Sequence, residues 1–164
     1  MNMGNRKGNS AIEFTLIAIP LLFVQFSLVE ICRCMWDYHS LAAAVKIASR
    51  TAATRGAGCA GQGCALTIDQ VARVVASYSG GMPSNVVSVT LTSNAGSVNC
   101  DPLNTCFGNA AVWPPAGGNT VGSDIVIAAT YPFTSMVSMF IPGKGGMRFT
   151  DVTFRAQSRQ TLLF

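Results

Sequence analysis

The sequence predicts an α+β protein: a long N-terminal helix, then a small head with a short helix and an antiparallel sheet of about three strands. The helix is predicted because none of the 16 glycines lies between Gly8 and Gly56, and only Pro20 precedes Pro83 among the prolines. Since glycine and proline break helices, residues 9–55 can form one helix, about 70 Å long at 1.5 Å per residue. The sheet is predicted because three later segments alternate apolar and polar residues.

The first part of this helix is apolar enough to cross a membrane. Residues 14–29 form a run of 16 residues without a charge. Adding residues 10–12 brings the stretch near the ~20 residues that a bilayer requires. Arg6 and Lys7 precede the run, which favours a cytoplasmic N-terminus. A cleaved secretory signal is the alternative, but "SLVEICRCMW" offers no small-residue cleavage site. We therefore expect residues 9–30 to remain as an anchor.

Residues 31–55 are predicted to continue the helix as a stalk with one apolar face. The apolar residues recur at steps of three and four: Ile31, Cys34, Met35, Tyr38, Leu41, Ala42 and Val45. We expect this stripe to lie on the head, on neighbouring subunits, or on both. Glu30, Arg33 and Asp37 are spaced for ion pairs along the helix.

Residues 56–164 are predicted to form the head. "TIDQVARVVASYSGG" indicates a short helix with Thr67 as its N-cap and an apolar face of Val71, Val74 and Val75. Three segments indicate strands with one buried face: "NVVSVTLTS", "SDIVIAATYPF" and "RFTDVTFRAQSRQTL". Their expected buried residues are Val87, Val89 and Leu91, then Ile125, Ile127, Ala129 and Tyr131, then Val152, Phe154 and Ala156. The stretch "FGNAAVWPPAGGNT" is predicted to be a loop.

The six cysteines indicate disulfides more than a metal site. Cys59–Cys64 and Cys100–Cys106 are each close in sequence, and we favour these two bonds, which make up one of the three connectivities that four cysteines allow. Zinc is the alternative, but the spacings are loose for a structural zinc site, so we expect no metal and no cofactor. Cys32 and Cys34 point about 200° apart on a helix and cannot bond to each other. Cys34 lies on the apolar stripe, so we expect it to be buried. A disulfide from Cys32 or Cys34 to a neighbouring subunit is the alternative.

Composition and motifs argue against an enzyme and against nucleic-acid binding. Only 11% of the residues are charged, and His39 is the single histidine. No serine lies in a nucleophile-elbow pattern, and "GAGCAG" lacks the preceding strand that a dinucleotide site requires. The net charge of +4 is concentrated at the N-terminus and in a basic tail made of Lys144, Arg148, Arg155 and Arg159. Nucleic-acid binding usually needs a denser positive field than this.

One charge inside the apolar segment requires an explanation. A carboxylate at Glu13 is costly in a bilayer unless it has a partner. "RKGNSAIEF" resembles the class III signal of type IV-like prepilins, in which a membrane peptidase cuts after glycine and leaves the apolar helix on the mature protein. The pair Glu13–Phe14 is similar to the form found in tight-adherence (Tad/Flp) pilins. "LAAAVKIASRTAATRGA" resembles the helix of TadE-like minor pilins.

The resemblance implies a cytoplasmic leader of residues 1–8, removed by prepilin peptidase between Gly8 and Asn9. The new α-amine, with a pKa of about 8, is then a charge partner for Glu13 in its own or a neighbouring chain. The implied partners are other pilins and the Tad assembly machinery of the bacterial inner membrane, with the head in the periplasm or in an extracellular pilus. The alternative is a single-pass anchored periplasmic binding or adhesion module, with DNA as one candidate ligand for the basic tail.

Overall fold

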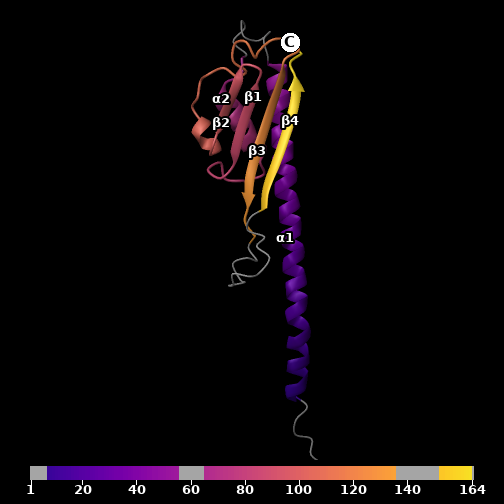
Figure 1. Ribbon diagram of the computed structural model, residues 1–164. Helices are drawn as coiled ribbons and strands as arrows, with labels where there is room; N and C mark the ends of the chain where they lie inside the picture. Colours follow the sequence, from indigo (N-terminus) through magenta and orange to yellow (C-terminus); the bar gives the residue numbers. More distant parts are fainter. Residues whose placement is uncertain (1–6, 56–64, 136–151, 164) are drawn as a thin grey trace, which may run out of the picture.

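The computed structural model describes residues 7–55, 65–135 and 152–163 and shows a long helix whose upper half carries an α+β head (Figure 1). The elements in chain order are helix α1 (Lys7–Thr54), helix α2 (Ile68–Tyr78), strands β1 (Ser88–Ser93) and β2 (Gly96–Cys100), the 3-10 turn η2 (Leu103–Cys106), and strands β3 (Asp124–Phe133) and β4 (Val152–Thr161). This confirms the predicted fold class, with four strands in place of about three.

Helix α1 is continuous over 48 residues and passes through Pro20. Its two halves have different surroundings, as Figure 1 shows: the N-terminal half extends away from the head and the C-terminal half lies along it. At 1.5 Å per residue the whole helix is about 72 Å long, as the absence of glycine predicts.

The sheet is antiparallel throughout, in the order β2–β1–β3–β4. Strands β1, β3 and β4 are the three predicted from alternation. Strand β2 is the additional one, joined to β1 by a two-residue turn in which Ser93 pairs with Gly96. Val98 is its only aliphatic residue and is half-buried, so β2 has the polar composition of an edge strand and no clear alternation.

The alternation predicts the buried face of the sheet correctly at most positions. Val87, Val89 and Leu91 are buried beside β3, all four expected residues of β3 are buried, and so are Phe154 and Ala156 of β4. Val152 was expected to be buried but is 39% exposed. It lies at the first position of β4, opposite Phe133, at the lower end of the sheet where the core ends.

Helix α2 begins at the predicted N-cap. The Thr67 hydroxyl accepts from the Gln70 amide at 3.2 Å, and the Gln70 side chain accepts from the Thr67 amide at 3.2 Å, which completes a capping box. Val71 and Val75 are buried, whereas Val74 is half-buried. Arg73 donates to Asp69 and the Gly108 amide donates to the same carboxylate at 2.7 Å; these bonds lower the pKa of Asp69.

The core lies between the sheet and the two helices. Helix α1 contributes Leu41 and Val45, both at most 1% exposed, together with a series of small residues: Ala44, Ala48, Ala52 and Ala53. Small side chains let the helix approach α2, β3 and β4 closely, and all three pack against it. A polar contact joins the layers where the Ser49 and Ser158 hydroxyls lie 2.7 Å apart. The upper part of the predicted stalk is therefore part of the head.

Candidate assembly surface and its junction with the head

The N-terminal half of α1 is an apolar surface that nothing else in the described structure covers. Its large side chains are half or more exposed on every side of the helix: Ile12, Phe14, Leu16, Ile17, Ile19, Leu21, Leu22, Phe23, Val24, Phe26, Leu28 and Val29. By length and composition the helix is a candidate membrane span. A helix that is apolar all round is stable only when lipid or other apolar helices surround it. This half is therefore a membrane anchor or a helix-packing surface.

Glu13 lies on this surface one helical turn beyond the predicted cleavage bond. Gly8 and Asn9 belong to the first turn of α1, and Glu13 is exposed in the second. Residues four apart lie on the same helix face, so Asn9 and Glu13 are neighbours, about 6 Å apart along the axis. Phe14 is 74% exposed on an adjacent face.

Arg33 joins α1 to the lower end of β3. Its guanidinium donates to the carbonyl oxygen of Thr134 at 2.7 Å and lies 4.9 Å from the centre of the Phe133 ring. It also pairs with Glu30 at 3.7 Å, as the spacing predicts. The contacts with β3 have no local sequence signal, since they join residues 101 positions apart.

Asp37 and Tyr131 interact electrostatically with Arg33 at this junction. Burial and the negative charge of Asp37 raise the pKa of the Tyr131 phenol, while Arg33 opposes that shift. The junction therefore combines a hydrogen bond, a cation–π contact and opposed charges at one position along α1.

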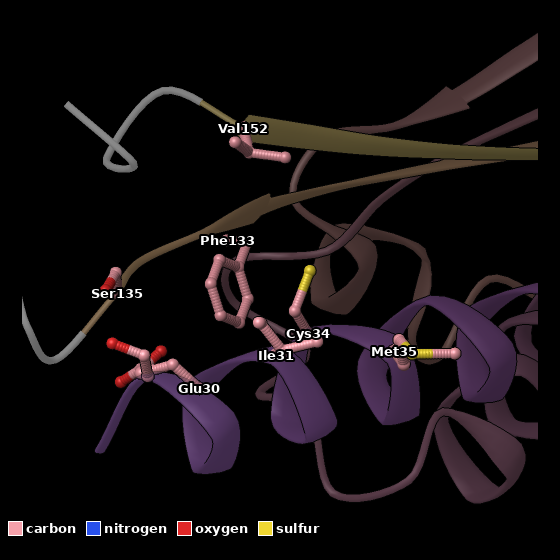
Figure 2. A pocket seen from close by; sticks show the side chains of 8 residues that line it. Glu30, Ile31, Cys34, Met35, Phe133, Ser135 and Val152 are labelled. Atoms are coloured by element: carbon pink, nitrogen blue, oxygen red, sulfur yellow. The ribbon is translucent and has the colours of Figure 1, made fainter. Parts of the chain in front are cut away.

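An apolar groove lies beside the junction, between α1 and the ends of β3 and β4 (Figure 2). It has a volume of about 260 Å³. Ile31, Cys34 and Met35 line it from the helix, and Phe133 and Val152 line it from the sheet. Figure 2 shows the Phe133 ring pointing toward Ile31 and Cys34. The lower part of the predicted apolar stripe thus forms a groove wall, while Leu41 and Val45 enter the core.

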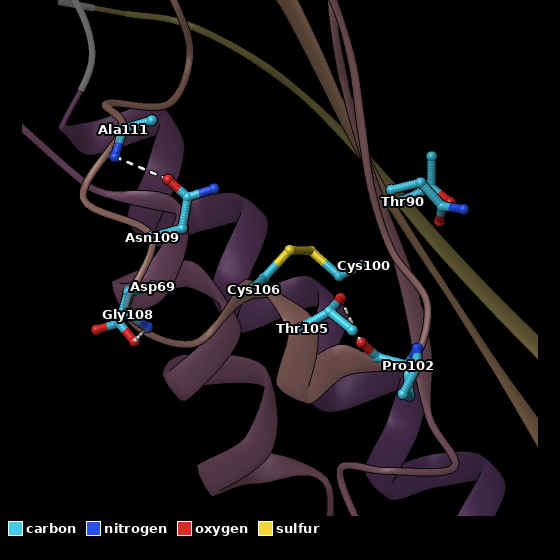
Figure 3. The surroundings of a disulfide bond; sticks show 10 residues. Asp69, Thr90, Cys100, Pro102, Thr105, Cys106, Gly108, Asn109 and Ala111 are labelled. Atoms are coloured by element: carbon cyan, nitrogen blue, oxygen red, sulfur yellow. Dashed lines mark hydrogen bonds between the residues drawn. A yellow bond between two sulfur atoms is a disulfide. The ribbon is translucent and has the colours of Figure 1, made fainter.

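Cys100 and Cys106 form a disulfide, one of the two favoured pairings (Figure 3). The bond closes the loop that holds η2 against the sheet, and both cysteines and Leu103 are buried. Cys59 and Cys64 lie outside the described residues. On α1, Cys32 is exposed and Cys34 is half-buried, and both are free thiols.

The structure describes two of the four residues of the predicted basic tail. Arg155 and Arg159 are exposed on β4, whereas Lys144 and Arg148 lie outside the described residues. Arg159 forms an ion pair with Asp124, and Thr161 donates to the same carboxylate at 2.8 Å. These bonds lower the pKa of Asp124. The charge of Arg159 is thus compensated locally.

Together these features define a class of protein: one apolar helix long enough to cross a bilayer, with its far half built into a small α+β head. Residues 8–50 match the family model of the TadE-like proteins, which confirms the resemblance over that segment. The match covers the apolar half of α1 with Glu13, and it covers Arg33 and most of the part of α1 that enters the core. It links this segment to proteins of the Tad pilus system. No curated protein and no solved structure matches the chain.

Proposed function

We propose that this protein is a minor pilin or pseudopilin of a Tad-type pilus. Residues 9–30 hold it in the bacterial inner membrane, with the N-terminus in the cytoplasm and the head in the periplasm. Prepilin peptidase removes residues 1–8, and the mature chain then assembles with other pilins and the Tad machinery. The protein itself contributes packing and pairing, with no catalysis and no cofactor.

One observation carries the proposal: Glu13 follows Asn9 by one helical turn at the start of an exposed apolar helix that matches TadE-like proteins. Cleavage after Gly8 creates a positive amine on the same helix face as this carboxylate. A carboxylate within an apolar layer is expensive alone, and pairing with the amine offsets much of that cost. Pairing with the amine of a neighbouring chain would also set the register between two helices.

The first test is the mature N-terminus. The full chain is expressed in strains with and without active prepilin peptidase, and its intact mass and N-terminal sequence are determined. We expect Asn9 as the first residue only where the peptidase is active. Retention of Met1 to Gly8 in the active strain would contradict the proposal and favour the plain anchored module.

The second test is Glu13→Gln, which removes the charge and keeps the shape. We expect normal insertion into the membrane and normal cleavage, but reduced recovery in the pilus or assembly fraction, because pairing is lost while the apolar surface is kept. Thr15→Ala is the matched control, since Thr15 is exposed two residues further along the same segment. Equal incorporation of both variants would remove the role assigned to Glu13.

A further inference from the structure

Among the described residues, the elements of the head end along α1 in the region of Trp36. A Cβ atom added to Gly80, in the turn after α2, would lie 2.7 Å from the Ser40 hydroxyl oxygen and 3.4 Å from Trp36 Nε1. The described part of β3 ends beside Arg33, three residues before Trp36 on the same helix. Figure 1 shows the described strands and the turn after α2 ending near the middle of the helix.

This level coincides with the expected edge of a bilayer. Residues 11–29 span about 28 Å, close to the ~30 Å hydrocarbon core. Arg33 and Trp36 then lie about 6 and 10 Å beyond Val29, at the depth of the headgroups. The Trp36 indole nitrogen lies near Gly80, while most of the side chain stays exposed.

The exposed aromatic residues at this end are of the kind that prefer the interface. Trp36 is 67% exposed and Tyr78, at the end of α2, is 52% exposed. Tryptophan and tyrosine are enriched where lipid headgroups meet water, because their rings are apolar and each carries a polar group. By contrast Trp113, the second of two tryptophans, is 1% exposed and its backbone amide donates to Leu66 at the opposite end of α2.

The groove is an independent observation at the same depth. Its lining begins at Ser27, within the last turn of the apolar run, and its wall is continuous with the exposed apolar surface at Leu28 and Ile31. Its volume of about 260 Å³ would hold several waters against an apolar wall, where they find few hydrogen-bond partners. Glu30, at the groove wall, pairs with Arg33, so these two groups add no net charge there. An apolar chain suits this groove better than water does.

We propose that the lower end of the head rests in the headgroup layer of the periplasmic leaflet, and that the groove between α1 and the ends of β3 and β4 takes a phospholipid acyl chain. Trp36 and Tyr78 lie in that layer. The inference rests on the proposed membrane anchoring and adds that the membrane itself supports the head.

The depth of Trp36 is measured by fluorescence with the full chain in phosphatidylcholine vesicles. The acyl chains are unlabelled, brominated near the headgroup, or brominated near the methyl end. The variant Trp113→Phe leaves Trp36 as the reporter, and Trp36→Phe leaves Trp113 as the matched control. We expect Trp36 to lose most of its fluorescence with shallow bromine and less with deep bromine, while Trp113 keeps its fluorescence in both.

The groove is measured with Val152→Trp in a chain that also carries Trp36→Phe and Trp113→Phe. Val152 is 39% exposed at the groove rim, so the larger ring can be accommodated. Val121→Trp in the same background is the control, at a position 68% exposed near the start of β3. We expect bromine to quench the fluorescence of the Val152→Trp variant but not that of the Val121→Trp variant, with no dependence on the ratio of protein to lipid. Quenching in the Val152→Trp variant that disappears as protein density rises would mean that a second copy fills the groove, and would overturn the lipid assignment.

Flotation with the vesicles and resistance to carbonate extraction separate the two proposals. A chain that does not remain with the membrane contradicts the anchor and this inference together. A chain that stays inserted while Trp36 is not quenched leaves the anchor intact and overturns the inference alone.

Discussion

Replacing Arg33 by methionine tests how firmly α1 is joined to the sheet. The variant Arg33→Met keeps most of the apolar stem and removes the guanidinium. It therefore deletes the hydrogen bond to the Thr134 carbonyl, the contact with the Phe133 ring and the pair with Glu30. We expect the lower end of β3 to open more often.

The size of the effect follows from these three contacts. A hydrogen bond from a charged donor contributes about 1.5–3 kcal/mol, and a partly exposed cation–π contact adds about 0.5–1 kcal/mol. The Glu30 pair, 3.7 Å long with the Arg33 side chain 30% exposed, adds little after solvent screening. The uncharged methionine also avoids the free-energy cost of removing the guanidinium from water, which reduces the net loss of stability. We therefore take the lower limit of the summed contributions, about 2 kcal/mol. At 1.4 kcal/mol per factor of ten, this corresponds to an equilibrium constant for opening that is about 30-fold larger.

Hydrogen–deuterium exchange of peptides from the end of β3 measures that opening. Arg50→Met is the matched control, because Arg50 is an exposed arginine on the same helix. Peptides from β1 and β2 serve as an internal reference. Exchange at the end of β3 that is equal in Arg33→Met, Arg50→Met and the unmodified chain would refute the assignment of Arg33 as the connection.

Two further predictions concern the stability of the head. Asp69 and Asp124 each have a folded-state pKa below the unfolded value, so the stability they add is complete above the ordinary aspartate pKa of about 4 and is lost as the pH falls through the folded values. The melting temperature should fall in that acidic range, and less steeply in the double variant Asp69→Asn/Asp124→Asn; equal slopes would contradict this. Replacing Cys100 and Cys106 by serine should lower the free energy of unfolding by about 2 kcal/mol through loop-closure entropy, measured as a urea midpoint shift. Cys32→Ser is the control, and an equal midpoint for both variants would contradict the stabilising role.

The elements that could be predicted are those whose signals are local. The absence of glycine over residues 9–55 predicts α1, and Thr67 as an N-cap predicts the start of α2. Alternation predicts β1, β3 and β4, because neighbouring side chains in a strand face opposite sides. Strand β2 was missed, since a short polar edge strand is held by its pairing with β1 and not by burial of its own side chains.

The sequence by itself therefore determined that an apolar helix leads into a small α+β head, and it predicted that Gly8, Asn9 and Glu13 act together. Only the tertiary structure decided where the described sheet and α2 meet α1 and which part of the apolar stripe is buried. Leu41 enters the core, whereas Ile31 and Met35 line a groove. The physical reason is that these properties depend on contacts between residues about 100 positions apart, such as Arg33 with Thr134. Such contacts follow from how the sheet packs on the helix, and no local periodicity records them.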